Sequence, residues 1–230
     1  MTDPLVRAQA KQLERLAELE AAGETVGGWK LGLTSGASRD AFGPGIRPFG
    51  YILNSRILPS AATLHWSRIG NGGIENEVCF VIGTDVTAPV DALSVRAAVA
   101  GVAPAFEINQ RRIPQDSPPE ERIADDLAQW GIVVGTPVAV PAQWDQQALT
   151  VTLSHDGRRV EQVAARGHID DHFESLATLA NALRAFDRHL RAGDRIITGA
   201  FGRANQPASG EWAGDFGAPL GRVTLNIELD

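Results

Sequence analysis

The stretch GIENEVCFVIG at residues 73–83 decides how this chain folds. Its apolar residues predict a buried β-strand. Side chains alternate between the two faces of a strand, so Glu75 and Glu77 share one face, and the apolar side chains at even-numbered positions lie on the other. Two carboxylates therefore stand on one side of a strand that otherwise belongs to the core.

Two neighbouring carboxylates in a buried strand need a cation. Without one they repel each other and lose their hydration, so they destabilise the strand or take up protons. Hard divalent ions such as Mg²⁺ and Mn²⁺ prefer carboxylate oxygens and keep positions open for water or substrate. Glu75 and Glu77 are therefore candidate metal ligands. The alternative is the solvent face of an antiparallel strand, where such a pair is common.

A third carboxylate follows in the next predicted strand. Residues 89–102 have the apolar spacing of a helix, and the apolar run VAPAFEI at residues 102–108 contains Glu107. A strand, a helical crossover and a second strand can bring distant residues side by side. Glu107 is therefore expected next to the first pair.

Length, charge and cysteine content restrict the class of protein. The 230 residues fit one large domain, or one domain with a modest N-terminal appendage. A net charge of −7 without a basic block argues against a nucleic-acid partner. No apolar run approaches the roughly 20 residues of a membrane span, and the N-terminal residues lack a signal-peptide pattern. Cys79 is the only cysteine, which excludes an intrachain disulfide. We therefore expect a cytoplasmic protein without a membrane partner.

The distribution of basic residues singles out Lys30. Of the 21 basic residues only Lys11 and Lys30 are lysines. Lysine, unlike arginine, can have its pKa lowered far enough to exchange protons. In the predicted strand Lys30 shares a face with Gly28 and Gly32, and glycines in a strand indicate close approach of a ligand or a neighbouring strand. The alternative is an exposed strand lysine.

Spacing and composition assign the other segments. Residues 5–22 have the pattern of an amphipathic helix, and Asp171 is predicted to cap a helix over residues 172–190. Residues 111–122 are polar and proline-rich, which predicts a loop. The remaining predicted elements are a hairpin around residues 149–161, strands at 195–202 and 223–229, and a turn at 214–215.

Five motifs occur in an order that resembles one family. They are GWKLGLTS at residues 28–35, IENE at 74–77, PAFEI at 104–108, IADD at 123–126 and TGA at 198–200. The chain resembles the 2-hydroxypentadienoate (2-keto-4-pentenoate) hydratase and 4-oxalocrotonate decarboxylase group of the fumarylacetoacetate hydrolase superfamily, from about residue 5 to the C-terminus.

The resemblance implies a fold and a metal site. The expected fold is α+β, a mixed β-sandwich roll with a small N-terminal helical region. We expect residues 1–55 to form the N-terminal helix and substrate-side region, and residues 56–230 the metal-binding catalytic roll. The implied metal is Mg²⁺ or Mn²⁺, held by Glu75, Glu77 and Glu107. Family members also form oligomers.

The resemblance also assigns roles to residues around the metal. Lys30 corresponds to the family's strand lysine, which exchanges a proton or fixes the substrate carboxylate, and Thr34 and Ser35 lie in the substrate-contacting turn. Asp125 corresponds to an active-site Asp that orients water or relays a proton. The chain departs from the family where an acid usually precedes Phe-Gly, because Arg47 stands in that loop. Arg47 is then a candidate for binding a second substrate carboxylate.

A second departure follows Asp125. Family members commonly have Asn at the next position, where this chain has Asp126. Together with the missing loop acid, which would be the expected partner of Lys30, this points to a different substrate or a different step.

The expected activity is that of a metal-dependent lyase. It would hydrate a small 2-hydroxydienoic acid, of the type of 2-hydroxypenta-2,4-dienoate, to 4-hydroxy-2-oxopentanoate in aromatic catabolism. The alternatives are decarboxylation of a 2-oxo-enedioate such as 4-oxalocrotonate, a non-catalytic partner subunit of a sister enzyme, or a protein that binds an acidic metabolite. A homo-oligomer is expected, and a complex with a sister enzyme of the family is a further expectation.

Overall fold

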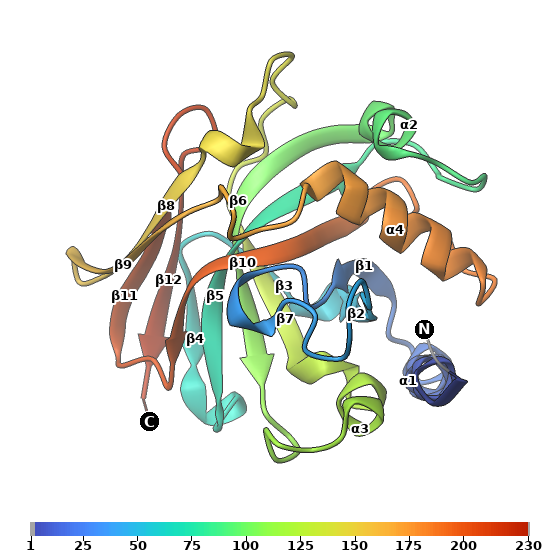
Figure 1. The fold of residues 1–230 in the computed structure, drawn as a ribbon. Coiled ribbons are helices and arrows are strands. Elements are labelled where there is room, and N and C mark those ends of the chain that lie inside the picture. The colour runs from blue at the N-terminus through green and yellow to red at the C-terminus, as the bar shows by residue number, and fades with distance from the viewer. Residues whose placement is uncertain (1–2, 230) are drawn as a thin grey trace.

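Two β-sheets pack against each other in the computed structural model, which describes residues 3–229 (Figure 1). The larger sheet has seven strands in the order β2-β1-β10-β5-β6-β7-β3, and the smaller has five in the order β4-β12-β11-β8-β9. The strands of the larger sheet are β1 (Val26–Leu31), β2 (Phe49–Leu53), β3 (Ile57–Pro59), β5 (Gly72–Ile82), β6 (Val99–Gln110), β7 (Gln129–Val134) and β10 (Arg195–Asn205). Those of the smaller sheet are β4 (Ala62–His65), β8 (Thr150–His155), β9 (Arg158–Ala164), β11 (Gly210–Asp215) and β12 (Arg222–Glu228).

The strand pairing is mixed, as predicted for an α+β roll. β1 pairs with β10, β3 with β7 and β4 with β12 in parallel, and the other pairs are antiparallel. β5 and β6 differ from the expected helical crossover, because they pair antiparallel and the short helix α2 (Ala92–Ala97) only bridges their ends. This pairing sets Glu75 directly opposite Glu107.

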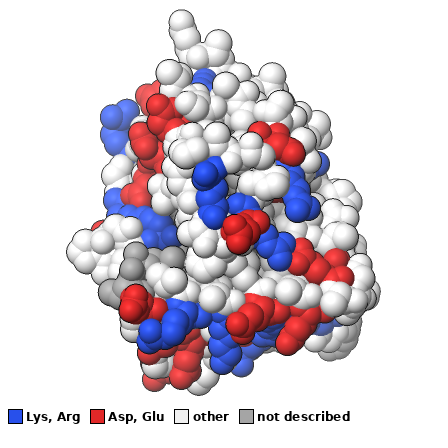
Figure 2. All heavy atoms as spheres, turned by 90° about the vertical axis from the view of Figure 1, so that its right-hand side faces the viewer, with Lys and Arg blue, Asp and Glu red and all other residues white. Residues whose placement is uncertain are grey.

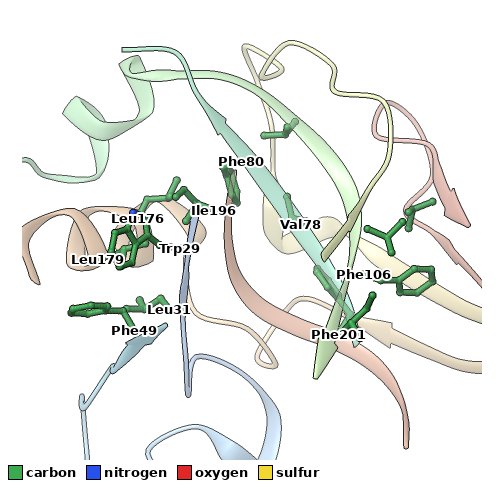
Figure 3. Packing of buried hydrophobic residues seen from close by; sticks show 14 of the residues in the cluster. Trp29, Leu31, Phe49, Val78, Phe80, Phe106, Leu176, Leu179, Ile196 and Phe201 are labelled. Carbon is green, nitrogen blue, oxygen red and sulfur yellow. The ribbon is translucent and has the colours of Figure 1, made fainter. Parts of the chain in front are cut away.

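The core lies between the sheets and beneath helix α4 (His172–Arg184). Ile74, Val78 and Phe80 on β5 are fully buried, and each such side chain stabilises the fold by about 1.5–3 kcal/mol. Figure 3 shows the other end of this core, where side chains of α4 lie close to Trp29 of β1. The predicted alternation of β5 is therefore observed, with the apolar face inward and the carboxylates on the opposite face.

Helix α1 (Asp3–Ala21) packs on helix α3 (Pro119–Ala124) and on β2. Its buried face includes two glutamines, Gln9 and Gln12, which both donate Nε2 hydrogen bonds to the carbonyl oxygen of Phe49, at 3.0 and 2.9 Å. Helix α1 thus packs against β2, which is an edge strand of the larger sheet. The division after residue 55 falls between β2 and β3 of one sheet and stays a prediction.

Three further expectations differ from the structure. Residues 111–122 are a loop only in their first part, since α3 begins at Pro119. Asp171 caps α4 through the backbone N–H groups of Phe173 and Glu174, as predicted, but the helix ends at Arg184 instead of residue 190. Residues 214–215 lie inside β11, where they pair with β12 in place of forming a turn.

The surface carries charged side chains of both signs, as the composition indicates. On the side of the molecule that carries α1, acidic and basic side chains alternate without an extended area of one sign (Figure 2). Within residues 3–229 no helix has both the length and the apolar character to cross a membrane.

The buried His172 makes the fold sensitive to acid. Burial lowers the pKa of His172 to about 4, below the ordinary 6.5, so the unfolded chain binds the proton more tightly than the folded one. The stability that this difference provides is present above pH 6.5 and is lost as the pH falls towards 4, at up to about 1.4 kcal/mol per pH unit. We expect His172→Gln to show a smaller loss of unfolding free energy between pH 7 and pH 5 in urea titrations. An unchanged pH dependence would refute this assignment.

Candidate metal-binding active site

Three glutamates from two adjacent strands form the centre of the site. Glu75 and Glu77 extend from β5, and Glu107 extends from β6 directly opposite Glu75. One carboxylate oxygen of each lies within 4.8 Å of those of the other two. Glu77 and Glu107 are buried and Glu75 is partly exposed. The structure therefore gathers the three predicted metal ligands at one point.

Burial and mutual repulsion disfavour the charged forms of the carboxylates in this cluster. Burial and the neighbouring Glu107 raise the pKa of Glu75, and the same two causes raise the pKa of Glu77 well above its usual range. The backbone N–H of Gly199 partly offsets this by donating to Glu77 Oε2 at 2.6 Å. Carboxylates whose charged forms are disfavoured in this way gain most from a bound cation, and an all-oxygen set suits a hard divalent ion.

Lys30 is the cation that the chain itself supplies. Its Nζ donates to Glu107 Oε1 at 2.5 Å and to the carbonyl oxygen of Leu127 at 3.1 Å. Burial alone would lower the pKa of Lys30, but the charge and hydrogen bond of Glu107 outweigh it, so the pKa is raised. This differs from the lowered pKa for which Lys30 was singled out. Glu107 also takes the place of the loop acid that was expected as the partner of Lys30.

The strand glycines near Lys30 serve close packing. A Cβ atom on Gly28 would lie 1.8 Å from the carbonyl oxygen of Arg195 on β10, so Gly28 allows close approach of the neighbouring strand. A Cβ on Gly50 of β2 would lie 2.8 Å from Asp126 Oδ1 and 3.2 Å from Lys30 Cγ. The second position therefore clears room beside the lysine stem itself.

The glutamates and Lys30 open into a cavity of about 190 Å³. Thr34 and Ser35, which follow β1, line it, as predicted for the substrate-side turn. Thr34 Oγ1 donates to the carbonyl oxygen of Thr198 at 2.5 Å, and Ser35 Oγ accepts from the N–H of Ala200 at 3.1 Å. These bonds join the turn to the bulged part of β10 that also holds Glu77.

Asp125 lines the same cavity at the end of α3. Its Oδ1 accepts from Arg112 Nε at 2.9 Å and lies 3.7 Å from Arg15 Nη1. Its Oδ2 is buried and accepts no hydrogen bond from the described residues. One oxygen is therefore fixed by arginine, and the other is left without a hydrogen-bond partner in this part of the structure.

A left-handed turn connects Asp125 to β7. Asp126, Leu127 and Ala128 have φ angles of 59°, 51° and 60°, a conformation that costs non-glycine residues about 1–2 kcal/mol each. Asp126 Oδ1 accepts the N–H of Tyr51 at 2.9 Å, and the carbonyl of Leu127 accepts Lys30. Strain of this kind persists only where surrounding contacts enforce it. Here the turn presents a carbonyl to the lysine.

Arg47 is not where the sequence placed it. It is absent from the cavity lining and binds two acids of neighbouring loops, with Nη1 2.7 Å from Asp40 and Nη2 2.8 Å from Asp170. Two carboxylates already satisfy its guanidinium, so no substrate carboxylate is needed there. The structure shows Arg47 in an ion pair between loops, and its predicted contact with a substrate carboxylate stays a prediction that this geometry does not support.

Three other arginines line the cavity instead: Arg111, Arg122 and Arg203. Arg111 could have been found from the sequence, because Glu107, Asn109 and Arg111 continue the same alternation and reach the same side. Arg203 could not, because irregular pairing interrupts the period of β10 on both sides of Ala200.

Most of this sequence matches one protein family. It is the fumarylacetoacetate (FAA) hydrolase C-terminal family, which matches residues 35–216. The chain belongs to the FAA hydrolase family. The matched range contains the three glutamates and Asp125, whereas Lys30 and Thr34 precede it.

Relatives of this chain include a hydratase and a decarboxylase. The chain is 30% identical over 206 residues to 2-hydroxyhexa-2,4-dienoate hydratase of Comamonas testosteroni, covering 86% of this chain and 77% of the relative. It is 28% identical over 194 residues to 4-oxalocrotonate decarboxylase of Pseudomonas sp. strain CF600, covering 84% and 74%. The structure of 4-oxalocrotonate decarboxylase from Pseudomonas putida G7, complexed with magnesium and adipate, matches with a TM-score of 0.88 at 25% identity, covering 99% of this chain and 87% of that one. These likenesses confirm the predicted group and fold.

Proposed function

We propose that this chain is a divalent-metal-dependent lyase that hydrates a small 2-hydroxydienoic acid in aromatic catabolism. The type reaction converts 2-hydroxypenta-2,4-dienoate to 4-hydroxy-2-oxopentanoate. The observation that carries the proposal is the cluster of three glutamates beside Lys30 in one cavity. The identity of 30% to a dienoate hydratase supports the choice of reaction.

Glu75, Glu77 and Glu107 would hold the metal, Mg²⁺ or Mn²⁺. The residues fit such an ion because they offer only carboxylate oxygens, lie within 4.8 Å of one another and have disfavoured charges. A bound divalent ion supplies Lewis-acid polarisation of the 2-oxo group of the substrate. The complex of the related decarboxylase with magnesium supports this choice of metal.

Lys30 and Asp125 would transfer the protons of the proposed reaction. Ketonisation of the dienol moves the enol proton to C5 and gives a conjugated 2-oxo-enoate, and water then adds its oxygen to C4 and a proton to C3. The ammonium group of Lys30 lines the cavity and lies beside Glu107, where it can reach a bound substrate and transfer a proton. The unpartnered Oδ2 of Asp125 can accept a proton from the attacking water. Thr34 and Ser35 would contact the substrate from the adjoining turn.

Absorbance of freshly prepared 2-hydroxypenta-2,4-dienoate tests this function. With Mg²⁺ or Mn²⁺ we expect the dienol band to disappear and 4-hydroxy-2-oxopentanoate to accumulate, and a chelator should stop the reaction. A persistent band in a sample shown to contain bound metal would contradict the hydratase assignment.

A second candidate reaction is decarboxylation of a 2-oxo-enedioate such as 4-oxalocrotonate. Arg111 and Arg122 favour it, because both line the cavity while contacting uncharged groups, the amide oxygen of Asn205 and the ring of Phe42. Guanidinium groups in such positions suit a second substrate carboxylate.

Charge removal at the cavity arginines separates the two reactions. If the substrate is a dicarboxylate, Arg111→Gln or Arg122→Gln should raise its KM about tenfold or more, because a charge-assisted hydrogen bond contributes roughly 1.5–3 kcal/mol. Turnover of the monocarboxylic dienoate should change less than about threefold in the same variants. Equal effects on both substrates would exclude a specific second-carboxylate contact. Arg47→Gln is the matched control, because Arg47 lies outside the cavity.

Assembly and location complete the proposal. The family resemblance supports a homo-oligomer, with a complex with a sister enzyme as a further possibility, and sedimentation velocity measures both. A non-catalytic partner subunit or a binder of acidic metabolites would hold metal without turning over any 2-oxo acid. The absorbance assay therefore also distinguishes a hydratase from these two alternatives. The cytoplasmic location stays a prediction.

A further inference from the structure

A second recess adjoins the active-site cavity. Side chains of the segment that follows α3 line both spaces. Asp125 and Leu127 line the cavity, and Asp126 and Gln129 line the recess. The recess offers about 60 Å³ of space. A volume of this size holds a few waters or one small anion, and none of the proposed steps of the reaction uses it.

Three arginines surround this recess. They are Arg15 of α1, Arg56 between β2 and β3, and Arg112 after β6. Arg112 donates to Asp125 Oδ1 and to the carbonyl oxygen of Gln129, and Arg15 lies 3.7 Å from Asp125 Oδ1. Among residues 3–229, Arg56 contacts only neutral groups of Trp130, donating to its carbonyl at 3.4 Å and lying 5.5 Å over its ring. The lining of the recess therefore carries three arginines and one carboxylate, that of Asp126.

The charges of Arg56 and Arg112 repel each other. Burial and the charge of Arg112 lower the pKa of Arg56, and Glu24 and Asp126 offset only part of this effect. The part of this shift that comes from Arg112 is repulsion between two neighbouring positive charges. A bound anion would relieve that repulsion.

Two neutral lining residues add hydrogen-bonding groups. Burial and Asp126 raise the pKa of Tyr51 to about 12, so its hydroxyl remains a donor at neutral pH. Gln129 donates its Nε2 to the carbonyl of Gly131, which leaves its buried Oε1 without a donor among the described residues. The recess thus offers several donors and two acceptors, Gln129 Oε1 and the carboxylate of Asp126, which suits an oxyanion that carries an O–H of its own.

We propose that the recess binds a small oxyanion of the phosphate class between Arg15, Arg56 and Arg112. Arginine forms paired hydrogen bonds with such groups, and hydrogen phosphate has an O–H for Gln129, which sulfate and acetate lack at neutral pH. Arg112 also holds Asp125 at 2.9 Å. The bound anion would therefore contact Arg112, whose partner Asp125 lines the active-site cavity.

Calorimetric titration of the Mg²⁺-loaded protein with inorganic phosphate tests the proposal. Arg56→Gln and the more exposed Arg15→Gln should each weaken phosphate binding about tenfold or more. Two controls should stay within about twofold of wild type. Arg68→Gln removes a charge that also lies over Trp130 but outside the recess lining, and Arg122→Gln removes one from the active-site cavity. The readout is binding, so it does not depend on which reaction the cavity performs.

Three results would overturn the proposal. The first is no phosphate binding by the wild type, and the second is equal binding by the wild type, Arg56→Gln and Arg15→Gln. The third is sulfate or acetate binding as tight as that of phosphate, which would remove the role given to Gln129.

Discussion

Glu107→Gln is expected to abolish turnover and to weaken Mn²⁺ binding while leaving the protein folded. Glu107 faces Glu75 across the strand pair and is one of three carboxylates in the cluster. Loss of a direct ligand should reduce metal affinity at least about 100-fold, the upper range for residues that only support ligands. Lewis-acid stabilisation amounts to several kcal/mol, so turnover should fall about 1,000-fold or more.

The fold should survive this substitution because two effects oppose each other. The change leaves Lys30 without its charged partner, which is destabilising in a buried site, but it also removes the repulsion that raises the pKa values of Glu75 and Glu77. Thermal unfolding and Mn²⁺ titration measure both outcomes, with the exposed Glu14→Gln as a charge-matched control. Normal metal binding and full activity in Glu107→Gln would refute the three-carboxylate site.

Lys30→Met is expected to separate catalysis from metal binding. If Lys30 transfers a proton, its loss should reduce kcat about 100- to 10,000-fold. Mn²⁺ binding should be retained or become tighter, because Lys30 Nζ competes for Glu107 Oε1 at 2.5 Å. This combination of slower turnover and undiminished metal affinity distinguishes a proton-transferring lysine from one that only shapes the metal site.

Lys11→Met is the matched control, since Lys11 is the only other lysine and lies exposed on α1. Rates and Mn²⁺ affinities measured side by side for the two variants check the prediction. Loss of metal together with activity in Lys30→Met would show that the lysine supports the glutamate cluster, and unchanged kcat would remove its proposed role altogether.

The centre of the site could be predicted because local patterns report it. The period of two in a strand puts Glu75 and Glu77 on one face. Glu107 was expected beside them through a helical crossover, and it does lie opposite Glu75, but through antiparallel pairing of the two strands. The resemblance to a known family added the expectation that these carboxylates hold a metal. The same alternation, extended two residues beyond Asn109, also leads to Arg111.

The surroundings of the site could not be predicted, because they depend on contacts distant in sequence. The left-handed turn at residues 126–128 consists of non-glycine residues and is held by Lys30 and Tyr51, so no local pattern reports it. Arg47 was expected at the substrate from its place in a loop, but two acids, one of them 123 positions away, occupy its guanidinium. Apolar spacing found α1, but not the glutamines that anchor it.

Anomalous diffraction from crystals grown with Mn²⁺ tests the central claim most directly. The account predicts one manganese position that contacts carboxylate oxygens of Glu75, Glu77 and Glu107, at about 2.0–2.6 Å, the range of hard divalent ions in proteins. Manganese bound elsewhere, with the three glutamates free of metal under conditions that support turnover, would contradict it.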